Sequence, residues 1–147
     1  MKVLTVLVPT YNVEKYLRRC LDSLLLPEVL EEIEVLVVND GSKDGSADIA
    51  RAYEKKYPQT VVFVDKENGG HGSTINVGIE KAQGTYFKVL DSDDWVNIGD
   101  FIEFVKRLKE ETADAVICDY RKEHVYNGKS EYFEYKDLED GKKYNLN

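Results

Sequence analysis

The sequence predicts an α/β fold in which a mainly parallel sheet is flanked by helices. Short apolar runs typical of strands alternate with segments whose apolar residues recur at a helical period. The first runs are almost continuously apolar, as strands buried on both faces of a parallel sheet are. Successive strand–helix–strand units of this kind join parallel strands through right-handed crossovers. The 147 residues are enough for one domain with a buried core.

The predicted elements follow one another closely along the chain. They are strands at residues 3–8, 33–38, 60–64, 86–90 and 115–120 and helices at residues 13–25, 46–57, 73–82 and 101–110. Pro27 and Pro58 end the first two helices because proline cannot continue a helix. Ser46 is expected to cap the second helix, and Gly84 fits the stop of the third.

The pattern changes after Arg121. Asn127-Gly128 predicts a hairpin with a tight two-residue turn. The polar tail that follows contains a second turn signal at Asp140-Gly141 and is assigned to no element. We therefore expect one domain over residues 1–120 and the start of another region over residues 121–147.

Composition excludes several classes of protein. The net charge of -8 argues against a nucleic-acid surface, which needs an excess of Lys and Arg. The sequence shows neither a signal peptide nor an apolar segment long enough for a membrane span. The two cysteines, Cys20 and Cys118, suit a reducing compartment and are expected to be core residues. These features predict a cytoplasmic location, with membrane association left to a longer parent chain.

The residues with unusual chemistry all fall in the loops that follow the first four strands. Ligands of parallel α/β sheets bind at this edge, close to the point where the strand order reverses. A random surface would scatter such residues. The four loops are residues 9–12, 39–45, 65–72 and 91–95. Their shared position predicts a binding site.

The fourth of these loops carries three carboxylates, Asp91, Asp93 and Asp94. Like charges this close repel one another unless a cation or several N–H donors lie among them. Carboxylate oxygens are the ligands that Mg²⁺ and Mn²⁺ prefer. The alternative is a solvated acidic turn that caps the next helix.

The other loops contain groups suited to a nucleotide. Asp40 follows a buried strand and can accept hydrogen bonds from a flat heterocycle, on which Tyr11 can stack. The alternatives are a loop carboxylate that caps its own turn and a rim aromatic that packs under the first helix. Residues 68–72, rich in glycine and placed before a helix, resemble an anion-binding turn. His71 within them is more simply a hydrogen-bonding loop histidine.

Taken in order, four motifs resemble the family 2 glycosyltransferases. The resemblance covers residues 2 to about 120. The motifs are Val8-Pro9-Thr10-Tyr11-Asn12 with Leu17 to Leu24, Val37 to Ser46, Glu67-Asn68-Gly69-Gly70 with Asn76 to Ile79, and Gly84 to Asp94.

This resemblance implies a Rossmann-like GT-A fold and a metal-assisted, inverting transfer of sugar from a nucleotide-diphospho-sugar. The expected donor is a UDP-sugar, the expected cofactor Mn²⁺ or Mg²⁺, and the expected acceptor a hydroxyl of a saccharide or lipid-linked molecule in cell-surface polysaccharide or glycan synthesis. Asp91 and Asp93 match the DxD motif and would bind the metal, and Asp94 would assist. The residues that match donor-binding positions are Pro9, Thr10, Tyr11, Asp40, Gly41, Ser42, Lys66, Asn68, Gly69, Gly70, Asp91 and Ser92.

Two features separate this chain from the usual family pattern. The family commonly has Ala-Arg-Asn where this chain has Thr74-Ile75-Asn76, so an arginine is missing. The general base of an inverting enzyme is expected beyond Asn147, so no catalytic residue is assigned and the fragment, truncated at its C-terminus, is expected to turn over poorly. Two other readings stay open: a non-catalytic nucleotide- or sugar-binding domain, and a receiver-like module that binds Mg²⁺.

Overall fold

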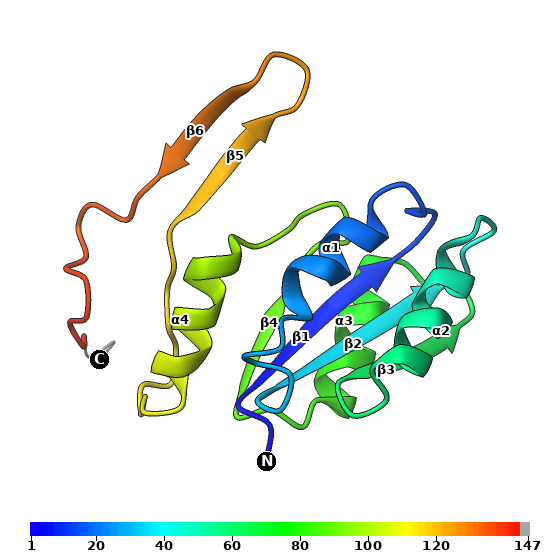
Figure 1. The fold of residues 1–147 in the computed structure, drawn as a ribbon, viewed down its shortest axis with the longest axis horizontal. Coiled ribbons are helices and arrows are strands. Elements are labelled where there is room, and N and C mark those ends of the chain that lie inside the picture. The colour runs from blue at the N-terminus through cyan, green and yellow to red at the C-terminus, as the bar shows by residue number, and fades with distance from the viewer. Residues whose placement is uncertain (145–147) are drawn as a thin grey trace. The chain divides into compact units, whose positions relative to one another are not determined.

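The computed structural model describes residues 1–144, which contain four helices and six strands (Figure 1). In chain order they are β1 (Leu4–Thr10), α1 (Leu17–Leu24), β2 (Ile33–Asp40), α2 (Ser46–Lys56), β3 (Val61–Lys66), α3 (His71–Lys81), β4 (Tyr86–Val89), α4 (Ile98–Leu108), β5 (Tyr120–His124) and β6 (Lys129–Phe133). The predicted alternation of strands and helices is confirmed for the first eight elements.

In the described part of the chain, the main sheet has four strands in the order β3-β2-β1-β4, and every pairing within it is parallel. β1 pairs with β2 from Leu4↔Ile33 to Thr10↔Asn39. The chain runs from β1 outward to β3 and then returns to place β4 on the other side of β1. The strand order therefore reverses between β1 and β4, which is where ligands bind in such sheets.

Helices cover both faces of this sheet. Leu4, Val6 and Val8 of β1 belong to the core cluster that also contains buried residues of α1, α2 and α4. Leu7 points to the opposite face, where α3 packs (Figure 1). Because side chains alternate along a strand, burial on both faces explains why β1 is almost continuously apolar.

Several helix boundaries differ from the predictions. α1 begins at Leu17, after a turn closed by the hydrogen bond from Leu17 N to Val13 O. α4 begins earlier than predicted because the Asn97 side chain accepts from Asp100 N and caps it. Ser46 does not cap α2, since its hydroxyl accepts a hydrogen bond from Val13 N instead.

The predicted strand at residues 115–120 is wrong. Only Tyr120 is in a strand, and residues 115–119 are exposed and non-regular. A strand needs an edge to pair with, and β6 pairs only with residues from Tyr120 onward. Cys20 is buried as predicted, whereas Cys118 is exposed, so its assignment to the core is also wrong.

The predicted hairpin is present as the antiparallel pair β5-β6, but its turn is longer than two residues. The pairing closes at His124↔Lys129, which leaves residues 125–128 in the loop. Gly128 has a φ of 66° and Gly141 one of 72°, a region that favours glycine over other residues. The turn predicted at Asp140-Gly141 is confirmed, and residues 145–147 of the predicted tail lie outside the described residues.

The chain divides into two compact units, Met1–Glu110 and a second unit from Glu111 onward. This division falls earlier than the boundary expected after residue 120. We find among the described residues no helix with the length and hydropathy that a membrane crossing requires.

Candidate functional site

The loops after β1 and β2 are joined by hydrogen bonds between side chains and backbone. Asn12 N donates to Ser42 Oγ at 3.0 Å, and Asn12 Oδ1 accepts from Lys43 N at 2.8 Å. Asp44 accepts from Glu14 N and from Ser46 N. Burial tends to raise the pKa of Asp44, but these hydrogen bonds outweigh it and the pKa is lowered. The two loops therefore form one rigid rim.

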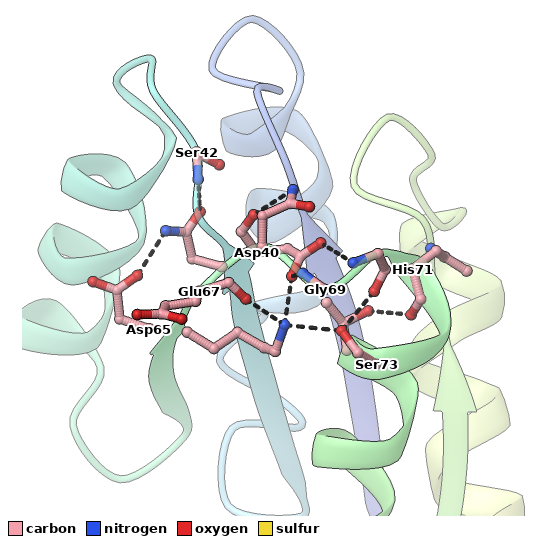
Figure 2. Close-up of polar contacts among 12 residues, drawn as sticks. Asp40, Ser42, Asp65, Glu67, Gly69, His71 and Ser73 are labelled. Atoms are coloured by element: carbon pink, nitrogen blue, oxygen red, sulfur yellow. Dashed lines mark hydrogen bonds and ion pairs between the residues drawn. The ribbon is translucent and has the colours of Figure 1, made fainter.

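Asp40 lies at the centre of the contacts between β2 and the loop after β3 (Figure 2). Its side chain is 5% exposed and accepts from Lys66 Nζ at 2.5 Å and from the amides of Gly69 and Gly70, each at 2.8 Å. Burial tends to raise the pKa of Asp40, but the ammonium and the two amides outweigh it, so the pKa is lowered. The glycine-rich turn predicted to bind an anion thus already holds an internal one.

Lys66 connects this carboxylate to α3. Its ammonium also donates to the Glu67 carbonyl at 2.6 Å and to Ser73 Oγ at 2.8 Å (Figure 2). The Lys66 side chain is only 19% exposed. A ligand that contacts Asp40 or Lys66 therefore meets groups whose positions are set before it arrives.

Glycine allows the loops after β2 and β3 to approach each other. Gly41 has a φ of 71°, and a Cβ there would lie 3.0 Å from Asn68 N. Asn68 in turn donates from its side-chain amide to the Asp40 carbonyl at 3.0 Å. Gly70 has a φ of 86° and precedes the first residue of α3. Larger residues at Gly41 would separate the two loops.

The residues predicted at the end of β1 differ in their exposure. Pro9 and Thr10 are buried, and the Thr10 hydroxyl donates to the Val8 carbonyl at 3.1 Å. Tyr11 is 49% exposed. Of these three predicted donor-binding residues, Tyr11 is therefore the one whose side chain is open to a ligand.

The acidic loop begins where β4 ends beside β1. Leu90 N donates to the Leu7 carbonyl, and Asp94 N donates to the Asp91 carbonyl, each at 2.9 Å. Ser92 is buried, whereas Asp91, Asp93 and Asp94 are exposed. Burial and the charges of Asp93 and Asp91 raise the pKa of Asp94. The loop thus concentrates negative charge at the edge where the other loops end.

Within residues 1–144 we find no group of three or more His, Cys, Asp or Glu side chains arranged to hold a metal ion. The donor set nevertheless fits a hard divalent cation, because it consists of three exposed carboxylates within four positions of one loop. Mg²⁺ typically takes only one or two protein carboxylates and completes its coordination with phosphate and water. Asp91 and Asp93 are the residues that would hold it.

The structure adds residues that the sequence reasoning did not assign to the site. His71 Nε2 lies 4.0 Å from Asp91 Oδ1, so the start of α3 faces the acidic loop. Helix α1 contributes Arg19, whose guanidinium lies 3.3 Å from the centre of the Trp95 ring. Arg19 lies within one of the motifs that resemble the family, but the spacing of residues along a helix does not reveal which distant loop the helix contacts.

An open cavity of about 570 Å³ lies beside the ends of β2 and β3. It includes three of the predicted donor-binding residues, Gly41, Ser42 and Lys66. The full lining is Asn39, Gly41, Ser42, Ala47, Arg51, Asp65, Lys66 and Glu67. Two of the lining residues are hydrogen-bonded to each other, since the Asn39 side-chain amide donates to Asp65 Oδ1 at 2.8 Å.

The chain resembles known enzymes in both sequence and structure. It is 41% identical over 126 residues to the putative glycosyltransferase EpsH of Bacillus subtilis, a match that covers 86% of this chain and 36% of the relative. The structure of S. aureus TarS residues 1–349 in complex with UDP superposes with a TM-score of 0.63 at 34% identity, over 75% of this chain and 32% of that TarS fragment. The mannosyltransferase PcManGT of Pyrobaculum calidifontis, in complex with GDP-Man and Mn²⁺, superposes with a TM-score of 0.60 at 28% identity, over 70% of this chain and 31% of PcManGT.

These matches confirm the predicted GT-A fold, and the chain spans about a third of the length of EpsH, of PcManGT and of TarS residues 1–349. The family model described as glycosyl transferase family 2 matches residues 5–142. The chain therefore belongs to glycosyl transferase family 2.

Proposed function

We propose that residues 1–110 bind the nucleotide-diphospho-sugar donor of a metal-assisted, inverting glycosyltransferase, with UDP as the nucleotide. The observation that carries this proposal is the convergence of Tyr11, Asp40 and the acidic loop at one edge of the sheet, in a chain that belongs to this family. The UDP complex of TarS supports the choice of nucleotide. The Mn²⁺ in the PcManGT complex supports the choice of metal.

We assign each group of residues to a different part of the donor. Tyr11 stacks on the base, and the cluster of Asp40, Lys66 and the glycine-rich turn contacts the nucleoside. Asp91 and Asp93 hold the cation at the diphosphate. When bound, Mn²⁺ or Mg²⁺ supplies positive charge against the negative charge that develops on the departing diphosphate. Prearranged groups of this kind lower the cost of positioning the donor.

The acceptor half of the reaction is proposed for the whole protein. An inverting transfer needs a general base that takes the proton of the acceptor hydroxyl. We assign no such base among residues 1–144, so the proposal for this chain is donor binding. A saccharide or lipid-linked acceptor, a role in cell-surface polysaccharide or glycan synthesis and a cytoplasmic location follow from the family resemblance alone and stay predictions.

Thermal unfolding in the presence of UDP, GDP and their sugars, each with and without Mn²⁺, tests the proposal. We expect UDP to raise the melting temperature only with metal, since a ligand at 100 times its Kd stabilises the folded state by about 2.7 kcal/mol. Asp93→Asn should abolish this shift. Asp48→Asn is the matched control, because the Asp48 side chain is 90% exposed and lies on α2.

A UDP shift that is the same without metal, or unchanged in Asp93→Asn, would contradict the metal site. Stabilisation by GDP and not by UDP would contradict the choice of nucleotide. Metal-dependent donor binding with no transfer by the complete protein would favour the non-catalytic reading.

A further inference from the structure

The acidic segment, residues 91–96, is held at both ends by helix α1. Cys20 Sγ lies 3.8 Å from the Asp91 carbonyl oxygen. Ser23 Oγ accepts a hydrogen bond from Val96 N at 3.2 Å and donates one to the Cys20 carbonyl at 2.7 Å. Three negative charges within four positions repel one another, so contacts to a fixed helix oppose the spreading of this segment.

Arg19 adds a contact on the outer side of the same helix. Its guanidinium carbon lies 3.3 Å from the centroid of the Trp95 ring. A planar guanidinium stacks well on an aromatic face and attracts its electrons, which a lysine ammonium does less effectively. Arg19 is exposed and Trp95 is half-buried, so the stack lies at the surface and outside the core.

We propose that Arg19 is a positioning residue: by stacking on Trp95 it holds the acidic segment in the conformation that presents Asp91 and Asp93 to a divalent cation and a nucleoside diphosphate. The identity of the ligand rests on the proposed function. Groups that are ordered before a ligand arrives lose less conformational entropy when it binds. Loss of the stack should therefore weaken binding that depends on the metal.

Arg18 provides a matched control. It precedes Arg19 on α1, is also exposed, and interacts with the hydroxyl of Tyr53 instead of with the acidic segment. Arg18→Ala removes the same charge from the same helix. A difference between the two variants then reports the contact with Trp95 and not the net charge of the protein.

Fluorescence tests the positioning without any ligand, because Trp95 is the single tryptophan of the chain. We expect Arg19→Ala to make Trp95 more accessible to quenching by acrylamide, Arg19→Lys to have a smaller effect, and Arg18→Ala to match the parent protein. Circular dichroism confirms that each variant is folded. Equal quenching in Arg19→Ala and the parent protein would overturn the proposal.

Calorimetric titration with UDP, with and without Mn²⁺, tests the consequence. The size of an exposed cation–π contact predicts that Arg19→Ala weakens UDP binding in Mn²⁺ by about two- to fivefold. A purely structural role would lower the melting temperature and leave this affinity unchanged. The double variant Arg19→Ala, Trp95→Ala should bind UDP in Mn²⁺ no more weakly than Trp95→Ala alone. The reason is that Trp95→Ala by itself already removes the contact between the two side chains.

The two experiments separate the proposals. An unchanged metal-dependent affinity in Arg19→Ala, or an equal loss in Arg18→Ala, overturns the role of Arg19 and leaves the proposed function standing. If the parent protein binds no UDP with metal, the proposed function fails, and acrylamide quenching still decides whether Arg19 orders the segment.

Discussion

At the residue scale, the candidate site contains some groups that already form hydrogen bonds within the protein and others that are exposed to a ligand. Asp40 accepts three hydrogen bonds from Lys66 and the glycine-rich turn, so a ligand gains only a shared contact there. Tyr11 is half-exposed, and Asp91 and Asp93 are exposed. The largest contributions to donor binding are therefore expected from Tyr11 and from the carboxylates of the acidic loop.

Tyr11→Ala should weaken UDP binding by about tenfold while leaving the stability of the protein nearly unchanged. Stacking of a base on an aromatic side chain contributes about 1–3 kcal/mol, and the exposed Tyr11 ring adds little to the core. Calorimetric titration with UDP and Mn²⁺ measures the effect. Tyr11→Phe should retain the affinity, and Tyr16→Ala, which removes an equally exposed ring, serves as the control. An equal loss in both alanine variants would argue against stacking by Tyr11.

Because the pKa of Asp40 is lowered in the folded protein, we expect the free energy of unfolding to depend on this residue at acidic pH. A carboxyl group whose pKa is lower in the folded than in the unfolded state stabilises the fold above its usual value of 3.8, and this contribution is lost as the pH falls through the folded pKa. We expect Asp40→Asn to reduce stability near pH 7 by about 3 kcal/mol, because Lys66 loses a buried partner. The variant should also depend less on pH below about 4.

Urea unfolding of the parent protein and the variant between pH 2 and pH 7 measures both effects, with about 0.5 kcal/mol or less expected for the exposed Asp48→Asn. Parallel stability curves for Asp40→Asn and the parent protein below pH 4 would contradict this role for Asp40.

At the element scale, the loops are positioned by the sheet, and one connection between its elements approaches a central strand very closely. Gly84 lies between α3 and β4 and donates from its amide to Thr5 Oγ1 at 2.8 Å. The Thr5 hydroxyl itself donates to the buried carboxylate of Glu34 on β2 at 2.7 Å. The sequence predicted Gly84 as a helix stop, but α3 ends at Lys81, and Gly84 is needed for close approach to β1.

Gly84→Ala should destabilise the fold by about 2–3 kcal/mol, the range expected for overpacking. A Cβ at this position would lie 2.4 Å from Thr5 N and 2.7 Å from Leu4 C, and backbone atoms of a central strand cannot move aside cheaply. Gly72→Ala is the matched control, since a Cβ on this residue of α3 meets nothing within 4 Å and alanine favours helix. Chemical denaturation of the two variants should give effects of opposite sign, and equal effects would contradict the packing argument.

At the scale of the whole molecule, the proposed donor site and the core lie in the same unit. Both hydrophobic clusters consist of residues up to Leu108, and every predicted donor- or metal-binding residue precedes Trp95. The first unit, Met1–Glu110, therefore contains the sheet, its helices and all four loops that form the site.

A protein of residues 1–110 should fold cooperatively and show the same metal-dependent UDP shift as the chain of residues 1–147. The reason is that this unit has its own core and carries the site intact. Circular dichroism and thermal unfolding with UDP and Mn²⁺ measure the two properties, and Asp93→Asn in the short protein serves as the negative control. A short protein that folds but loses the UDP shift would show that residues from Glu111 onward take part in donor binding.

The sequence by itself determined the class of the fold and predicted the edge of the sheet at which the candidate site lies. Strands β1 and β2 could be predicted because burial on both faces leaves a continuous apolar run. Strands β3 and β4 are only partly buried, and they were predicted from short apolar runs between helical segments. The carboxyl ends of parallel strands lie at one edge of the sheet. The sequence therefore predicted that the loops that follow these strands lie close together. The strand predicted at residues 115–120 failed because an apolar run does not reveal whether a partner edge exists.

Only the tertiary structure decided how the site is held. The pairing of Asp40 with Lys66 and the glycine amides joins residues far apart in the chain, and the stack of Arg19 on Trp95 joins a helix to a loop of another strand. Neither contact leaves a periodic signal, because each depends on which distant element the fold places beside the residue, such as the pairing of Asp40 with Lys66 across β2 and β3. Strand spacing and charge thus predict the binding edge, whereas the contacts that hold its side chains come from long-range packing.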